Sequence, residues 1–141
     1  MANNEPKQIL IWRNDLRNIN GQKCRTGKIA AQLAHASMAA FLNQGKLYQP
    51  EQSDDTMFNV ELTGALKEWI TGRFTKICVS VDNEQELVDI INTAESAGLI
   101  TSLITDAGLT EFGGVATVTC GAIGPGYPCD IDPITGHLKL L

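Results

Sequence analysis

The sequence contains no apolar run that approaches the roughly 20 residues that a membrane-spanning helix needs. Its first eight residues, MANNEPKQ, also lack the apolar stretch that a secretory signal places before its cleavage site. The balance of 43% apolar and 19% charged residues excludes a disordered chain, which needs less hydrophobicity and more charge. We therefore expect a cytoplasmic protein that folds as one domain over residues 1–141 and has no membrane partner.

Cysteines and aromatic residues are also few. The cysteines at positions 24, 78, 120 and 129 form no Cys-x-x-Cys pair and no Cys/His cluster, which argues against a zinc site. Without an export signal we expect no disulfides, and we interpret the cysteines as small buried hydrophobes. Two tryptophans do not make an aromatic ladder for stacking bases, so Trp12 and Trp69 are expected in the core.

The net charge of −5 argues against a surface that coats nucleic acid, but the charges are unevenly spread. Residues 1–28 carry six basic and two acidic side chains, whereas residues 29–141 carry five basic and fourteen acidic ones. A basic edge on an acidic body can bind a polyanion locally. A solvated loop of chance composition explains the same pattern.

Apolar periodicity predicts strands that alternate with helices. Strand 8–12 opens at Lys7, and its uninterrupted apolar run is typical of a strand covered on both faces. Thr26 is the expected N-cap of a helix over 27–42, and Asp82 that of a helix over 83–97. The other expected elements are a turn-rich acidic excursion over 43–59, a helix over 60–71, strands over 76–81, 99–105 and 115–123, and a closing tail over 131–141. This order predicts an α/β fold with helices on both faces of a sheet.

The segment GQKCRTGK (21–28) lies between the first strand and the first helix, as a phosphate-binding loop does. Five residues separate its glycines instead of four, and Ile29 stands in place of the magnesium-binding Ser or Thr. These departures argue against nucleotide hydrolysis. A weaker prediction remains, because a helix N-terminus beside Lys23, Arg25 and Lys28 favours anions.

Two further residues are candidates for chemistry. Asp106 follows the carboxyl end of a predicted strand, where open α/β sheets place ligands, and Gly108 suggests a backbone with positive φ. An ordinary turn aspartate explains the same pattern. His35 lies at helical spacing from Lys28 and Gln32, but a lone helical histidine is also a common packing residue.

Taken together, several segments of the chain resemble the type-2 peptidyl-tRNA hydrolase family. The segment GKIAAQLAHA (27–36) closely matches that family's signature helix, and DAGLT (106–110) is similar to its aspartate-containing turn. The other similar segments, in chain order, are RNDL (13–16), WITGRFTK (69–76), GL (98–99), TVT (117–119), IGP (123–125) and TGHLKLL (135–141). Because all of them occur in order, the resemblance covers most of the chain.

The resemblance implies a single three-layer α/β/α domain around a mixed, roughly four-stranded sheet, often as a homodimer. It implies a hydrolase that cleaves the ester between a peptide, or a blocked aminoacyl group, and the 3′ end of tRNA, with no metal or other cofactor. The positions that match the family's active-site residues are Lys28, Gln32, His35, Asp106, Thr110 and Thr119. The backbone phosphates of tRNA are expected on a basic segment that contains Arg13, Arg17, Lys23 and Arg25.

The chain departs from the family pattern in two segments. The stretch between Leu16 and Gly27 is longer than the family's usual turn, and residues 43–66 are longer and more acidic. Two other function classes stay open on the sequence: a non-catalytic tRNA- or nucleotide-binding module on the same scaffold, and an interaction protein that dimerises through the alanine-rich helix and the 43–66 excursion. The carboxylate of Asp106 favours the hydrolase, because binding alone does not require it.

Overall fold

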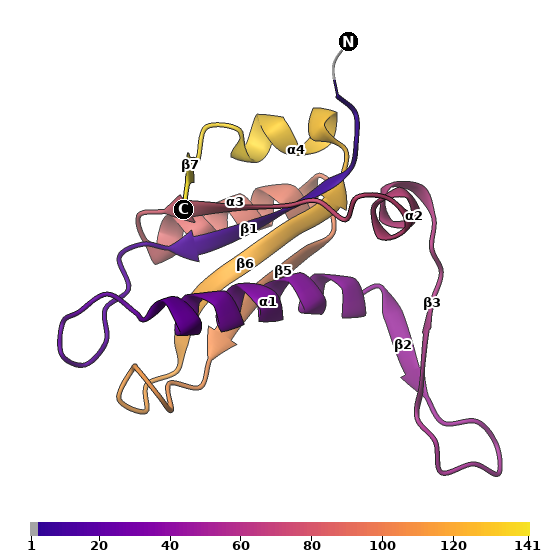
Figure 1. Ribbon diagram of the computed structural model, residues 1–141, viewed down its shortest axis with the longest axis horizontal. Coiled ribbons are helices and arrows are strands. Elements are labelled where there is room, and N and C mark those ends of the chain that lie inside the picture. Colours follow the sequence, from indigo (N-terminus) through magenta and orange to yellow (C-terminus); the bar gives the residue numbers. More distant parts are fainter. Residues whose placement is uncertain (1–2) are drawn as a thin grey trace.

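The computed structural model describes residues 3–141, which form four helices and two sheets (Figure 1). The helices are α1 (Thr26–Leu42), α2 (Gly64–Thr71), α3 (Glu84–Ser96) and α4 (Pro128–Thr135). The strands are β1 (Lys7–Arg13), β2 (Gly45–Tyr48), β3 (Met57–Val60), β4 (Lys76–Val81), β5 (Thr101–Asp106), β6 (Thr117–Gly126) and β7 (Lys139–Leu140). The main sheet has the order β5-β6-β1-β4-β7, in which β1 and β4 are parallel and the other neighbours are antiparallel.

The apolar run of β1 is buried on both sides, as its sequence predicts. Leu10 and Trp12 belong to the core beneath α1, whereas Ile9 and Ile11 belong to the core that α3 and α4 cover. This alternation follows from the two-residue period of a strand, and it places helices on both faces of the sheet (Figure 1). The predicted three-layer α/β/α fold is therefore confirmed.

Small side chains allow α1 to approach the sheet closely. Ala36 and Ala40 are fully buried, and the Ser102 hydroxyl of β5 donates a 2.7 Å hydrogen bond to the backbone carbonyl of Ala36. Leu33 packs in the same core cluster. These contacts determine where the first turn of α1 stands relative to the end of β5, which is the region of the candidate active site.

The structure corrects several predicted elements. Within the described residues the main sheet has five strands rather than roughly four, because Lys139 and Leu140 pair with β4 as β7. The acidic excursion contains the β2–β3 hairpin, whose four-residue strands are too short to show a clear period (Figure 1). The helix expected from residue 60 begins at Gly64. The first part of the expected tail, residues 131–135, belongs to α4, which starts before the tail with Pro128 at a position that favours proline.

Both predicted helix caps are wrong by one residue. Thr26 is the first residue of α1, and Arg25 occupies the N-cap position without a capping side-chain hydrogen bond. Asn83 caps α3, since its side-chain oxygen accepts a 2.8 Å hydrogen bond from the backbone N–H of Glu86. Asp82 lies one position earlier, and its backbone N–H donates a 3.0 Å hydrogen bond to the Glu86 carboxylate.

Two loops meet at one end of the molecule, at the left of Figure 1. One is the segment 14–25 between β1 and α1, and the other is the segment 107–116 between β5 and β6. The backbone N–H of Ile19 donates a 3.1 Å hydrogen bond to the carbonyl of Glu111, which joins the loops. Among residues 3–141, every helix is too short or too polar to cross a membrane.

Candidate active site

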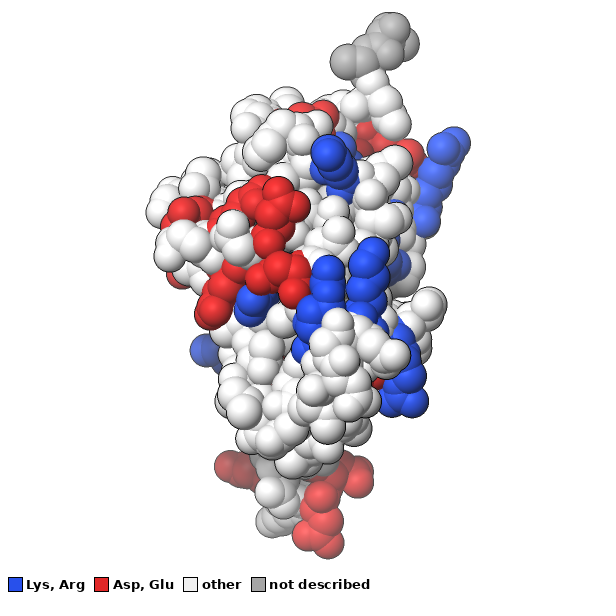
Figure 2. All heavy atoms as spheres, turned by 90° about the vertical axis from the view of Figure 1, so that its left-hand side faces the viewer, with Lys and Arg blue, Asp and Glu red and all other residues white. Residues whose placement is uncertain are grey.

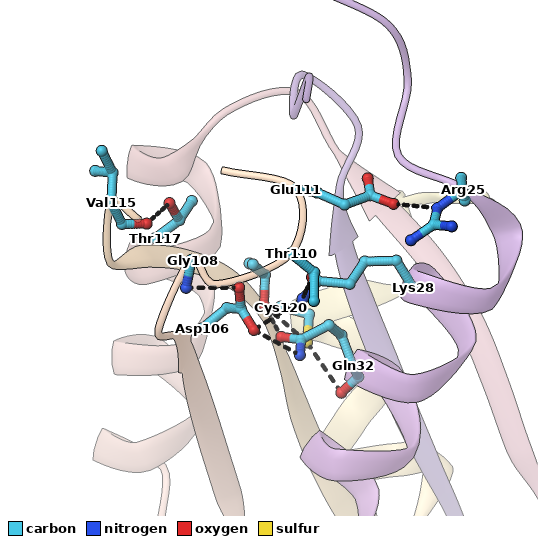
Figure 3. Close-up of polar contacts among 11 residues, drawn as sticks. Arg25, Lys28, Gln32, Asp106, Gly108, Thr110, Glu111, Val115, Thr117 and Cys120 are labelled. Carbon is cyan, nitrogen blue, oxygen red and sulfur yellow. Dashed lines mark hydrogen bonds and ion pairs between the residues drawn. The ribbon is translucent and has the colours of Figure 1, made fainter. Parts of the chain in front are cut away.

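The candidate site lies where the first turns of α1 meet the β5–β6 connection (Figure 3). Asp106 is the last residue of β5 and pairs in register with Thr117, the first residue of β6. Lys28 and Gln32 are one helical turn apart on α1, so both side chains project toward this strand end. The antiparallel β5–β6 pair and the position of α1 thus bring residues 28 and 106 together.

An ion pair between Lys28 and Asp106 occupies the centre of the site. Lys28 Nζ lies 3.0 Å from Asp106 Oδ1, and the two side chains are only 12% and 13% exposed. The same ammonium donates a 2.9 Å hydrogen bond to Thr110 Oγ1. Because Thr110 accepts through its oxygen, its own hydroxyl proton stays available to donate to a ligand.

A second chain of hydrogen bonds holds Gln32 against Asp106. Gln32 Nε2 donates to Asp106 Oδ1 at 3.2 Å, and Gln32 Oε1 accepts from the Thr119 hydroxyl at 2.7 Å. A hydroxyl donor at Oε1 orients the amide so that its N–H group points to the carboxylate. Thr119 is fully buried and therefore acts behind Gln32 rather than at the surface of the site.

A β-bulge aims Thr119 at α1. Ile104 pairs with Cys120 and Thr105 pairs with Val118, so Thr119 is the extra residue of β6. Regular alternation would turn Thr119 to the opposite face from Cys120. Instead both bond to Gln32, since the Cys120 thiol donates to its backbone carbonyl at 3.3 Å. The bulge therefore supplies two contacts that a regular strand would divide between the faces.

The turn after β5 fixes the second oxygen of the carboxylate. The backbone N–H of Gly108 donates a 2.9 Å hydrogen bond to Asp106 Oδ2. Gly108 has a φ of 82°, which confirms the positive φ expected from the sequence. A Cβ at this position would lie 2.1 Å from the carbonyl oxygen of Val115, so the turn requires glycine.

These contacts keep the Asp106 carboxylate ionised. Burial alone would raise its pKa, but the hydrogen bonds from Lys28, Gly108 and Gln32, together with the charge of Lys28, outweigh burial and lower the pKa below its ordinary value. The site therefore combines an ionised carboxylate, an ammonium group and a free hydroxyl donor within one hydrogen-bonded cluster. This donor and acceptor set can orient water and stabilise an oxyanion, which is the chemistry of ester hydrolysis.

Comparison with known proteins agrees with this chemistry. The family model described as "Peptidyl-tRNA hydrolase PTH2" matches residues 6–141. The chain belongs to the PTH2 family. The resemblance drawn from the sequence motifs is thereby confirmed.

Three curated relatives are similar to this chain over almost its whole length. The peptidyl-tRNA hydrolase of Methanocaldococcus jannaschii is 40% identical over 135 residues, which cover 96% of this chain and 99% of that protein. The peptidyl-tRNA hydrolase of Thermococcus onnurineus is 37% identical over 96% of this chain and 97% of its own length. The Bos taurus protein named "Peptidyl-tRNA hydrolase 2, mitochondrial" is 39% identical over 96% of this chain and 64% of its own length.

The PTH2-type active-site residues expected from the sequence fall into two groups. Lys28, Gln32, Asp106, Thr110 and Thr119 are joined by hydrogen bonds into one cluster (Figure 3). His35 is exposed on α1, one turn beyond Gln32, and makes no hydrogen bond or ion pair within residues 3–141. The cluster therefore forms without His35.

The basic residues expected to hold tRNA differ in how freely they face solvent. The Arg13 side chain is 13% exposed and bonds Asp15 and the backbone carbonyl of Val118, so its charge is largely committed within the protein. Arg17 is exposed but donates to two backbone carbonyls of its own loop. Lys23 is exposed next to it, at the isolated bridge that closes residues 17–23. The remaining member, Arg25, pairs with Glu111.

Sequence reasoning missed Glu111. Its side chain is 4% exposed, and its Oε1 accepts a 2.7 Å hydrogen bond from Arg25 Nε. A single acidic residue between a threonine and a phenylalanine gives no pattern that distinguishes it from a solvated loop residue. Among residues 3–141, no group of three or more His, Cys, Asp or Glu is arranged to hold a metal ion.

From the lowered pKa of Asp106 we expect a contribution to stability that depends on pH. At pH values above the unfolded-state pKa of Asp106, near 3.8, the contacts of the carboxylate stabilise the folded state. This stabilisation is lost as the pH falls through the folded-state pKa, which is lower. We expect Asp106→Asn to lower the free energy of unfolding most above about pH 5, with the difference from the wild type shrinking below that range. Urea denaturation between neutral and acidic pH measures this difference.

Asp55→Asn, in the exposed tip of the β2–β3 hairpin, is the matched control and should follow the wild-type profile. A difference between Asp106→Asn and the wild type that stays constant over the whole pH range would show that the ionised carboxylate is not stabilised by its neighbours.

Proposed function

We propose that this chain hydrolyses the ester bond between a peptide, or an N-blocked aminoacyl group, and the 3′ end of tRNA, and that the Lys28–Asp106 cluster is its catalytic site. The observation that carries the proposal is the 3.0 Å ion pair between these two side chains, with Thr110 and Gln32 bonded to the same pair. The membership of the chain in the PTH2 family supports the substrate class.

In the proposed reaction a water molecule attacks the ester carbonyl carbon. Asp106 accepts a hydrogen bond from this water and takes up its proton, using the lone pairs that its present contacts leave free. Because the pKa of Asp106 is lowered, the carboxylate is a weak base, and orienting the water is the larger part of its role. The bond between the carbonyl carbon and the 3′ oxygen then breaks, and the 3′ oxygen receives the proton.

Lys28 and Thr110 act on the charge that develops in this step. The ammonium and the free hydroxyl proton of Thr110 both donate toward an oxyanion beside Asp106. Gln32, held by Thr119, keeps the carboxylate in place through its amide N–H. His35, exposed one turn along α1, stays an active-site residue predicted from the family resemblance alone.

Asp106→Asn tests the assignment directly. The amide keeps the shape of the side chain, but it cannot take the proton and it accepts a hydrogen bond from water more weakly than a carboxylate does, so we expect kcat to fall by about 10² to 10⁴ with little change in KM. The measurement is release of an N-blocked amino acid from tRNA, in steady state and in a single turnover. A variant with wild-type kcat would contradict the role of Asp106, and tRNA binding without turnover by the wild type would favour a non-catalytic binding module.

In this proposal the phosphates of the tRNA backbone bind to the basic side chains of the 14–25 loop. Figure 2 faces the end of the molecule that carries this loop, and Lys and Arg side chains gather there beside a separate group of Asp and Glu. Arg17, Lys23 and Arg25 are exposed on the loop, whereas Arg13 is largely committed to internal contacts. A local basic surface of this kind binds phosphates despite the net charge of −5.

The salt dependence of binding tests this surface. Replacing both Arg17 and Lys23 by Ala removes two cations, so the slope of log K against log salt should fall by roughly 1 to 2 while kcat is unchanged. Fluorescence anisotropy of labelled tRNA at several salt concentrations gives the slope. Lys67→Ala, at an exposed position on α2, is the control. An unchanged slope in the double variant would place the phosphates elsewhere.

A homodimer is also part of the proposal, through the side of α1 that faces away from the catalytic cluster. A groove of about 700 Å³ runs between α1 and α2, and Leu33, Phe41 and Trp69 are among its apolar lining residues. Met38 and Phe74 border it and are strongly exposed, which is unusual for a surface left in water. A two-fold axis would cover the grooves of both copies with the same contacts.

The single-domain organisation over residues 1–141 and the cytoplasmic location stay predictions from the sequence.

Met38→Glu tests the dimer. A charge in the apolar groove should convert a dimer to a monomer in sedimentation velocity experiments, while a wild-type chain that sediments as a monomer at all concentrations would contradict the proposal. Glu51→Lys, on the exposed hairpin loop, is the control for a change of charge at a distant site.

A further inference from the structure

Glu111 is a buried carboxylate with an unusual partner. Its side chain is 4% exposed, yet the cation that compensates its charge, Arg25, is 77% exposed. Oε1 accepts from Arg25 Nε at 2.7 Å, while Oε2 is buried without a hydrogen-bond partner within residues 3–141. Since an unpaired buried carboxylate is costly, Arg25 stabilises Glu111 where it lies, and the neighbouring Cys24 thiol also lowers the pKa of this carboxylate. The hydrogen bond from Arg25, the largest influence on this group, accordingly lowers the pKa of Glu111.

The Arg25–Glu111 pair connects the two segments that build the catalytic cluster. Glu111 directly follows Thr110, and Arg25 precedes Lys28 by three residues at the start of α1. Figure 3 shows the pair beside the Lys28–Thr110 contact, with one partner in the 107–116 loop and the other at the head of the helix. The ion pair is therefore one of the contacts that hold the loop carrying Thr110 against α1, together with the Lys28–Thr110 hydrogen bond and the backbone bond from Ile19 to Glu111.

Arg25 also has a free edge. A guanidinium presents five N–H donors in a planar fork, and Glu111 uses the Nε donor. The two Nη groups make no hydrogen bond within the described chain, and the side chain faces solvent. This open edge has the shape that binds a phosphate through two parallel hydrogen bonds, which the point charge of a lysine cannot do.

We propose that Arg25 is a positioning residue that joins phosphate binding to the catalytic loop: its Nη edge binds a phosphate of the tRNA substrate while its Nε holds Glu111, and through it Thr110, against Lys28. The proposal rests on the function proposed above and adds a link between binding and turnover. A phosphate on the Nη edge restricts the rotamers of an otherwise exposed side chain, so the loop contact is held more firmly when substrate is bound.

The test is a double-mutant cycle with kcat and KM measured separately on N-blocked aminoacyl-tRNA. Glu111→Gln keeps the shape but loses the charge-assisted hydrogen bond, and we expect kcat to fall about tenfold with KM changed less than about twofold. In Arg25→Lys a single ammonium group replaces the guanidinium and cannot bind both Glu111 and the tRNA phosphate in the same way. We therefore expect kcat to fall about tenfold and KM to rise. In the double variant kcat should be no lower than in Arg25→Lys alone, because both changes break the same link.

Arg73→Lys is the matched control. Arg73 is 81% exposed and also pairs through Nε with a glutamate, Glu5 at 3.4 Å, but it precedes β4 at the end of the sheet away from the site. Its replacement should change neither kcat nor KM. Thermal unfolding checks that each variant folds, and Arg25→Lys, which leaves a cation beside Glu111, carries the kcat comparison by itself if Glu111→Gln does not fold.

The outcomes separate the two proposals. Wild-type kcat in Glu111→Gln, or losses that multiply to about a hundredfold in the double variant, would overturn the link between Arg25 and the loop. A wild-type protein that releases no acyl group would instead overturn the proposed function itself. A normal KM for Arg25→Lys together with a lowered kcat would contradict the phosphate contact of the Nη edge.

Discussion

The ion pair between Lys28 and Asp106 is the interaction on which the candidate site depends. Both charged groups are nearly nine-tenths buried, and each is acceptable there because the other compensates it. The partners come from residues 78 positions apart in the chain, so the pair also ties the head of α1 to the end of β5. Because the carboxylate stays ionised and the ammonium stays beside it, one interaction supplies structure and chemistry together.

A shell of weaker interactions orients this pair. Gln32 donates to Asp106 through one end of its amide and accepts from Thr119 through the other, which gives the amide a single orientation. The β-bulge at Thr119 makes this possible by turning the hydroxyl to the α1 face. The glycine turn at Gly108 holds the other carboxylate oxygen. The ion pair therefore has little freedom to rotate, as a preorganised site requires.

The two sides of α1 differ in character. One side carries Lys28 and Gln32 toward the polar cluster, and the other lines an apolar groove with small alanine side chains and Phe41. The basic 14–25 loop stands at the N-terminal end of the same helix. A single amphipathic element thus separates a polar reaction site from an apolar surface, and this separation is consistent with proposing catalysis for one side and self-association for the other.

Local sequence patterns were enough to predict the individual elements and the family. The apolar run of residues 8–12, the alanine-rich helix and the DAGLT turn are local patterns, and they predicted the α/β layers and the positive φ of Gly108. Which side chains contact one another follows instead from the packing of the folded chain. The bond of Thr119 to Gln32 and the pairing of Glu111 with Arg25 join residues 87 and 86 positions apart, and no local periodicity encodes such contacts. His35 illustrates the same limit, because its helical spacing matches the site residues while the structure leaves it exposed and outside the hydrogen-bonded cluster.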